Sequence, residues 1–268
     1  MSLVAVLLLG LLQGLTEFLP VSSSGHLVLA QSFISGFSQP GALLDVALHL
    51  GTLGAVCVYF RRDIFLLATA CFSADHPEAA TSRHFLWLLV MGSVPTMIIG
   101  LSFREQFESL FTNPQGVGLA LLVTGTLLFV TDRIRGQGRP LSEMRVRDAV
   151  LIGIAQGCAI VPGISRSGTT ITAGVVLGLE RDLLVRYSFL LSVPMIGGAF
   201  LLQLLLHWEE IVSGIDVFAY TLGTLVAAGV GYASIPLLIR MTRSQRLSPF
   251  AYYCWVIGGL AVLLTTDF

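Results

Sequence analysis

The chain has 268 residues, of which 54% are hydrophobic and only 12% are charged, and its mean hydropathy is +0.84. Soluble domains carry about twice that charged fraction, so these values exclude an ordinary water-soluble domain and indicate a lipid environment. The formal net charge of −1 provides no basic field for nucleic acid. The four cysteines form no C-x-x-C pair, which argues against a zinc site or a disulfide framework.

Six apolar stretches approach the roughly 20 residues that a helix needs to cross a bilayer. They are residues 42–60, 85–103, 116–131, 187–206, 217–239 and 249–264. The sequence therefore predicts an all-α polytopic membrane protein with about six transmembrane helices, and a single membrane domain over residues 1–268.

Two further apolar stretches are interrupted. Residues 3–19 run into Pro20 and a serine-rich turn before residues 27–34, and residues 150–161 run into Pro162-Gly163 before residues 169–179. Apolar pieces of about 10–14 residues that are broken by Pro and Gly are typical of re-entrant half-helices. We therefore expect two re-entrant helical hairpins in addition to the six spans.

The two interrupted stretches resemble each other. A shift of 143 positions superimposes Gly10 on Gly153, Gln13 on Gln156, Ser22 on Ser165, Ser24 on Ser167 and Gly25 on Gly168. The alternative explanation is composition, because Gly and Ser are common in membrane helices. The shared spacing favours a repeat, with the first copy at about 1–135 and the second at about 148–268.

The arginines orient the chain, because cytoplasmic loops of membrane proteins are rich in basic residues. They gather in the linker 131–148, in residues 240–248 and in the loop after Phe60, which opens with Arg61 and Arg62. Residues 207–216 hold three acidic residues and no Arg, so we expect them outside. Each half then has one hairpin and three spans, which inverts the second half relative to the first and brings the two hairpin tips together near the midplane.

The first tip contains a buried acid and a possible cation site. Gln13 and Glu17 are four residues apart and share one helix face. A charge inside a membrane helix costs roughly 2.5–3.5 kcal/mol and usually serves function, although a Glu at a helix end could also reach interfacial water. The oxygens of Glu17 and Gln13 could hold a divalent cation such as Mg²⁺ or Ca²⁺.

The serine-rich turn after Pro20 precedes a new helix. Serine is a favoured N-cap, and the N–H groups of a helix start attract anions. We assign capping to Ser22 and Ser24, and a role in the site to Ser23 and His26 because Glu17 is near in sequence. Ser22 and Gly25 would also approach a bound phosphate.

The second tip points to phosphate. Arg166 stands alone between apolar stretches, and its planar fork of donors suits phosphate oxygens. The neighbouring hydroxyls that could add donors are Ser165, Ser167 and Thr170. The alternative is a structural ion pair between Arg166 and Glu17. Asp45 and His49, four residues apart, could support the site from behind or simply be a polar helix start.

Phosphoryl transfer requires charge stabilisation and in-line positioning above all. Arg166 and the two helix starts could supply the charge stabilisation. Ser23 or His26 could be the nucleophile, or His26 could act as acid or base. From another functional class, a carrier or flippase for a polyprenyl phosphate lipid would share the repeat architecture. A carrier needs an anion site but no nucleophile beside a carboxylate.

The segments EFLPVSSSGH (17–26) and PGISRSGTT (162–170) resemble the signatures of the bacterial undecaprenyl pyrophosphate phosphatases, the bacitracin-resistance family. The resemblance implies hydrolysis of undecaprenyl diphosphate on the periplasmic face of the inner membrane, which recycles the lipid carrier for peptidoglycan synthesis and confers bacitracin resistance. The family's reactive Ser and His correspond to Ser23 and His26, and its phosphate-binding Arg corresponds to Arg166. Its acidic signature corresponds to Gln13 and Glu17, with one carboxylate fewer at Gln13. The expected partners are the polyprenyl diphosphate substrate and the bilayer, and a homodimer is left open.

Overall fold

The computed structural model describes residues 2–34, 43–70, 72, 79–206 and 216–265. Within these ranges the regular elements are helices. Four of them are long and apolar enough to cross a membrane, namely α5 (Ala79–Ser102), α7 (Pro114–Thr131), α10 (Arg181–Leu206) and α12 (Val217–Arg243). The other two predicted spans are the 17-residue helices α3 (Leu43–Tyr59) and α13 (Ser248–Leu264). The prediction of an all-α multi-pass membrane protein is confirmed.

The segment after Phe60 was expected to be a loop, and that prediction is wrong. Arg61 begins a second helix, α4 (Arg61–Ala70), which is bent by 74° from α3. The helix forms because it is amphipathic: Leu67 is buried while Arg61 and Arg62 are exposed. Two other short elements, α6 (Arg104–Leu110) and the 3₁₀ turn η1 (Leu141–Glu143), were also not predicted.

Both interrupted stretches are helix pairs. The first consists of α1 (Leu3–Thr16) and α2 (Ser23–Ser32), and the second of α8 (Val146–Cys158) and α9 (Arg166–Val176). The second helix of each pair begins three to four residues before the predicted position, because Ser22 and Ser165 are the N-caps and accept the amide protons of Gly25 and Gly168. Ser23 and Arg166 therefore lie in first helical turns.

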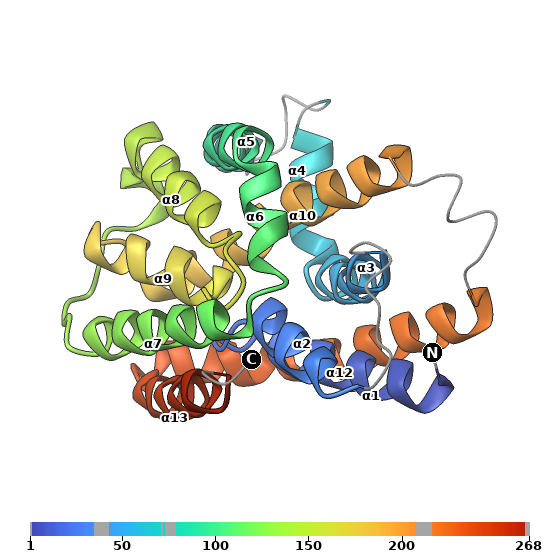
Figure 1. Cartoon of the computed structure of the whole chain (residues 1–268). Helices are drawn as coiled ribbons and strands as arrows, with labels where there is room; N and C mark the ends of the chain where they lie inside the picture. The colour runs from blue at the N-terminus through green and yellow to red at the C-terminus, as the bar shows by residue number, and fades with distance from the viewer. Residues whose placement is uncertain (1, 35–42, 71, 73–78, 207–215, 266–268) are drawn as a thin grey trace.

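Each hairpin packs against a helix from the other half of the chain (Figure 1). Helix α1 contacts α12, and α8 contacts α5. The two contacts use glycines at equivalent places: a side chain on Gly10 would meet the carbonyl of Gly223, and one on Gly153 would meet the carbonyl of Gly92. Packing of each hairpin on a helix of the other half suits an inverted repeat. The boundaries of the two repeats stay a prediction. Residues 207–216 were expected to lie on the outer side of the membrane, and all of them except Asp216 are outside the described part of the chain.

We predict that Gly153→Ala destabilises the protein, because the added methyl group would collide with backbone of α5 at Gly92 rather than with a side chain that can move. Overpacking of this kind costs about 1–3 kcal/mol. The thermal unfolding midpoint of the detergent-solubilised protein measures this loss of stability. Gly54→Ala is the matched control, since nothing lies within 4 Å of a side chain there. Equal midpoints for the two variants would contradict the close α5–α8 contact.

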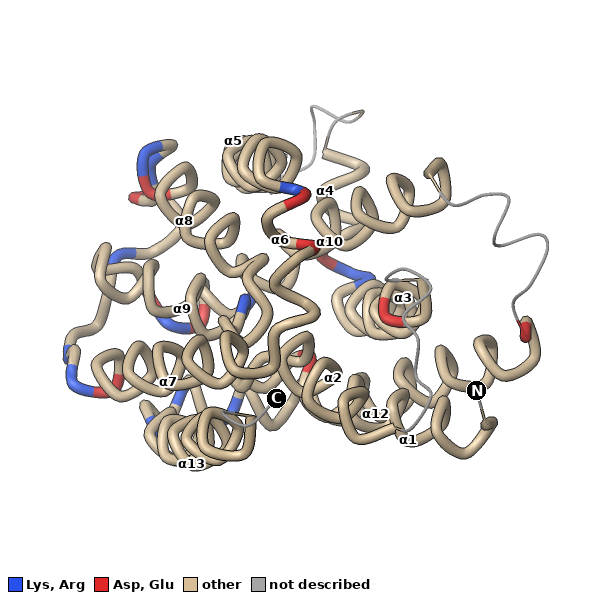
Figure 2. The backbone as a smooth tube through the Cα atoms, in the orientation of Figure 1, with Lys and Arg blue, Asp and Glu red and all other residues tan. Residues whose placement is uncertain are grey.

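The linker 131–148 carries much of the charge along one edge of the molecule (Figure 2), and it also anchors α13. The carboxylate of Asp132 accepts hydrogen bonds from the backbone N–H of Leu247 at 2.9 Å and of Ser248 at 2.6 Å. These bonds satisfy the start of α13, which packs along α7. Farther along α13, Cys254 is buried in a cluster with Val21 and Val28, so α13 also contacts the first hairpin tip.

Candidate active site

Glu17 is the centre of the site. It caps the end of α1, and its side chain is buried. Its Oε1 accepts a hydrogen bond from the Arg166 guanidinium at 2.6 Å, while Oε2 accepts from Ser23 Oγ at 2.5 Å and from Gln13 Nε2 at 2.9 Å. The two hairpin tips therefore meet, as the sequence predicts, and the helical spacing of Gln13 and Glu17 does place both on one face. The ion pair considered as an alternative for Arg166 is present.

A histidine from α3 also contacts the acid. His49 Nε2 lies 3.3 Å from Glu17 Oε2, and its Nδ1 lies 2.6 Å from the backbone oxygen of Asp45. A carbonyl oxygen has no proton to give, so Nδ1 must carry the hydrogen. The Asp45 carboxylate accepts from Gln31 Nε2 at 2.6 Å. His49 was expected to support the site from behind, and it is in direct contact with Glu17. The Asp45 side chain is instead held by Gln31, which was not among the predicted site residues.

His26 is held by a backbone oxygen and by a residue of α13. Its Nδ1 lies 2.8 Å from the backbone oxygen of Ser22, and its Nε2 lies 2.8 Å from the hydroxyl of Tyr253 on α13. Within the described part of the chain, it forms no hydrogen bond with Glu17 or Ser23. The role in the site that the sequence predicts for His26 stays a prediction. Tyr253 was not among the predicted site residues.

Arg166 is the first residue of α9, and its side chain is 9% exposed. Besides Glu17, its guanidinium approaches the backbone oxygen of Ser188 in α10 at 3.5 Å. Thr170, one turn later, shares a hydrogen bond of 2.6 Å with the Ser188 hydroxyl. One side of the site is therefore formed by α10. The sequence pattern did not reveal this, because Ser188 is one of a few hydroxyls within a mostly apolar span.

The other predicted phosphate-binding residues hold the tips together. Ser22 Oγ accepts the backbone N–H of Gly163 in the opposite tip at 3.1 Å. A side chain on Gly25 would collide with Gly163, so only glycine allows the approach. Ser167 donates to the backbone oxygen of Phe18 at 3.2 Å. These contacts join the two tips across the middle of the protein.

The site has oxygen donors for a cation. Within the described ranges there is no group of three or more His, Cys, Asp or Glu side chains that could hold a metal ion by themselves. However, the side-chain oxygen of Gln13 is buried without a hydrogen-bond partner, on the same amide group whose nitrogen donates to Glu17. Mg²⁺ commonly binds through one or two protein oxygens together with substrate phosphates. The residues fit a cation that the substrate helps to hold.

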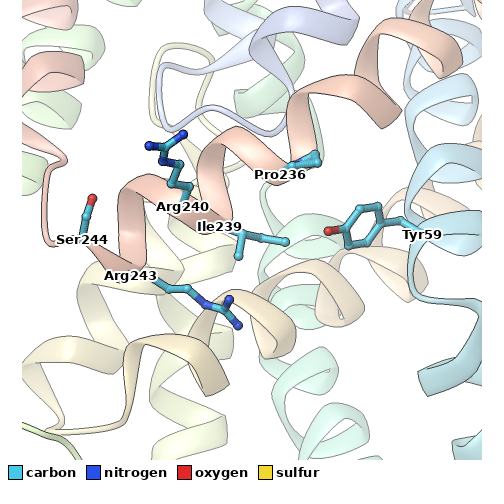
Figure 3. Close-up of a pocket in the computed structure, with 6 residues that line it drawn as sticks. All are labelled: Tyr59, Pro236, Ile239, Arg240, Arg243 and Ser244. Carbon is cyan, nitrogen blue, oxygen red and sulfur yellow. The ribbon is translucent and has the colours of Figure 1, made fainter.

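A surface pocket between α3 and α12 is separate from this site (Figure 3). It is lined by Tyr59, Pro236, Ile239, Arg240, Arg243 and Ser244. None of these residues forms a hydrogen bond or ion pair with Glu17 or Arg166 in the described structure. The charged cluster at the tips, rather than this pocket, has the chemistry of an active site.

Comparisons with known proteins cover almost the whole chain. The family model of the bacitracin resistance protein BacA matches residues 6–260, which include both tips. The chain is 50% identical over 260 residues to the undecaprenyl-diphosphatase of Syntrophotalea carbinolica, covering 97% of this chain and 98% of that protein. It is 40% identical over 272 residues to the undecaprenyl-diphosphatase of Halothermothrix orenii, with both chains fully covered. It is 44% identical over 273 residues to that of Desulfosudis oleivorans, with 95% of each covered.

Proposed function

Because this chain belongs to the bacitracin resistance protein BacA family, we propose that it is a membrane phosphatase that hydrolyses undecaprenyl diphosphate to undecaprenyl phosphate and inorganic phosphate. This activity recycles the lipid carrier for peptidoglycan synthesis and confers resistance to bacitracin. The observation that supports the chemistry is the hydrogen bond of 2.5 Å from Ser23 Oγ to Glu17 Oε2. A hydroxyl beside a carboxylate that a third group orients is the arrangement of an activated nucleophile.

In the first step, Ser23 Oγ attacks the terminal phosphorus while its proton passes to Glu17. The bond between that phosphorus and the bridging oxygen breaks, and undecaprenyl phosphate leaves with the bridging oxygen. Ser23 is then a phosphoserine. In the second step, water attacks the phosphoserine, inorganic phosphate departs, and Glu17 returns its proton to Ser23 Oγ. Both steps pass through a transition state whose charge lies on phosphate oxygens.

Arg166 stabilises that charge. Its guanidinium has five N–H donors in a planar fork, and a single one of them holds Glu17 Oε1 at 2.6 Å. The remaining donors are able to form charge-assisted hydrogen bonds with the diphosphate, and hydrogen bonds of this class are strong. Arg166 therefore orients the base and binds the group being transferred, so the ion pair with Glu17 and phosphate binding are compatible roles.

A divalent cation, Mg²⁺ or Ca²⁺, would be held by Glu17 and the free oxygen of Gln13, and it would neutralise charge on the diphosphate when bound. We predict that EDTA lowers phosphate release by about 10²-fold and that Mg²⁺ restores it. Gln13→Glu adds the second carboxylate, and it should lower the Mg²⁺ concentration that gives half the maximal rate. An undiminished rate in EDTA would contradict the cation site.

The cellular setting of the enzyme completes the proposal. We place the protein in the bacterial inner membrane with the site facing the periplasm, because the arginine-rich segments favour the cytoplasmic side. A homodimer and the lack of a nucleic-acid partner stay predictions. The deciding experiment is phosphate release from undecaprenyl diphosphate by the purified protein in detergent with Mg²⁺ and with Ca²⁺. Release supports the phosphatase, whereas none with either cation would favour a lipid carrier.

A further inference from the structure

The protonation pattern of His26 follows from its two partners. The backbone oxygen of Ser22, 2.8 Å from Nδ1, can only accept, so Nδ1 carries a hydrogen. In the neutral imidazole, Nε2 then has a lone pair, and the Tyr253 hydroxyl donates to it at 2.8 Å. The two ring planes are within 6° of parallel. His26 is therefore set up as a neutral base whose basic nitrogen is covered by one phenol.

Tyr253 is well placed to connect that nitrogen with the reaction. His26 itself is buried, with 7% of its surface exposed, whereas Tyr253 is 42% exposed. Ser23 and His26 are three residues apart in the first turn of α2, so they share a helix face. The next residue of α13, Cys254, packs against Val21 and Val28 of the first hairpin, so α13 holds the phenol firmly beside the tip.

The proposed second step lacks a base for the attacking water. Glu17 still carries the Ser23 proton at that stage, and it must return this proton to Ser23 Oγ as the phosphoserine bond breaks. It cannot also take the proton of water. His49 Nε2 faces Glu17 Oε2 at 3.3 Å, whereas His26 and Tyr253 form an acceptor pair whose hydrogen bonds do not involve Glu17.

We propose that Tyr253 relays the proton of the attacking water to His26. As the water oxygen bonds to phosphorus, its proton passes to the Tyr253 oxygen, and the Tyr253 proton passes to Nε2. The phosphoserine P–O bond breaks, Ser23 Oγ recovers its proton from Glu17, and His26 becomes a cation that later loses its proton to solvent. This inference rests on the proposed phosphatase reaction, and it assigns different residues to the two steps.

The test uses Tyr253→Phe in the full-length protein with undecaprenyl diphosphate. Removal of the hydroxyl should lower kcat for phosphate release by about 10²-fold, at the low end of what a positioned general base contributes. Because only the second step slows, a phosphoserine should accumulate from ³²P-labelled substrate. Tyr252→Phe is the matched control: it is the neighbouring tyrosine on α13, it is 55% exposed, and its ring packs on Phe129 and Trp255. Its kcat should stay within about twofold of wild type.

A double-mutant cycle separates a relay from a structural effect. If Tyr253 acts through His26, the double variant Tyr253→Phe with His26→Gln should be no slower than His26→Gln alone. The ¹⁵N resonance of His26 Nε2 should also move in Tyr253→Phe, which can be read without any turnover. Unchanged kcat, a slow enzyme without phosphoserine, or additive effects in the cycle would each overturn the relay. Absence of phosphate release by the wild type would instead overturn the proposed function, and the ¹⁵N measurement would still show whether the phenol hydrogen-bonds to His26.

Discussion

Arg166→Ala should lower phosphate release by about 10³-fold or more. An arginine that binds a transferring phosphoryl group contributes about 10³–10⁵ to the rate, and Arg166 also holds the carboxylate that accepts the Ser23 proton. Arg166→Lys keeps the positive charge but loses the planar fork, so it should recover only part of the rate. Phosphate release by each purified variant measures these effects.

The loss must be separated from unfolding, because Arg166→Ala leaves the Glu17 carboxylate buried without its main counter-ion. Breaking a buried ion pair on one side costs about 3–5 kcal/mol. The double variant Arg166→Ala with Glu17→Gln removes the stranded charge, so its thermal stability should recover while its activity stays lost. Arg240→Ala removes an exposed arginine of the pocket between α3 and α12 and should leave the rate unchanged. Rapid turnover by a folded Arg166→Ala protein would disprove the phosphate-binding role.

Ser23→Ala should lower phosphate release by at least about 10³-fold and prevent any phosphoserine from forming. The side chain donates to Glu17 at 2.5 Å, and the lost hydroxyl is the atom that attacks. Ser24→Ala is the neighbouring control, because the hydrogen bond of Ser24 Oγ among the described residues is with the capping hydroxyl of Ser22, at 3.3 Å. Trapping of ³²P on the wild type and its absence from Ser23→Ala would identify the nucleophile.

His26→Ala gives the complementary result. Under the proposed mechanism it slows the second step, so phosphoserine accumulates rather than disappears. If His26 were the nucleophile, His26→Ala would instead be inactive and would carry no ³²P label. Ser23→Ala would then keep robust turnover. The two variants thus decide a choice that the sequence leaves open.

Much of this arrangement could be predicted from local pattern. Apolar length identified the spans, the Pro and Gly interruptions identified the hairpins, and helical spacing placed Gln13 beside Glu17. The approach of Arg166 to Glu17 followed from the repeat, since an inversion brings two broken tips to the same depth. These features depend on residues close in sequence or on a symmetry visible within it.

The remaining site residues come from helices whose rotation the sequence does not fix. Tyr253 and Ser188 are polar groups on nearly apolar spans, and periodicity gives no direction for a helix that is apolar on most sides. His26 was predicted to belong to the site, but the sequence indicated no partner for its ring, and in the structure its Nε2 lies beside the Tyr253 hydroxyl of α13. The helix after Phe60 was not predicted because its first residues are charged, as in a loop. Only two of its residues, Leu67 and Ala70, are buried, so its apolar face is hard to recognise in the sequence.

The ion pair between Glu17 and Arg166 joins residues separated by 149 positions, and this has a consequence during synthesis. At about 5–20 residues per second, the ribosome needs roughly 7–30 s to make the arginine after the glutamate. The surface of α12 that receives Gly10 is made later still. During that interval an unpaired carboxylate would be costly inside lipid. The first hairpin is therefore expected to remain at the membrane surface and to enter late, so a nascent chain arrested before Arg166 should leave Glu17 accessible to water.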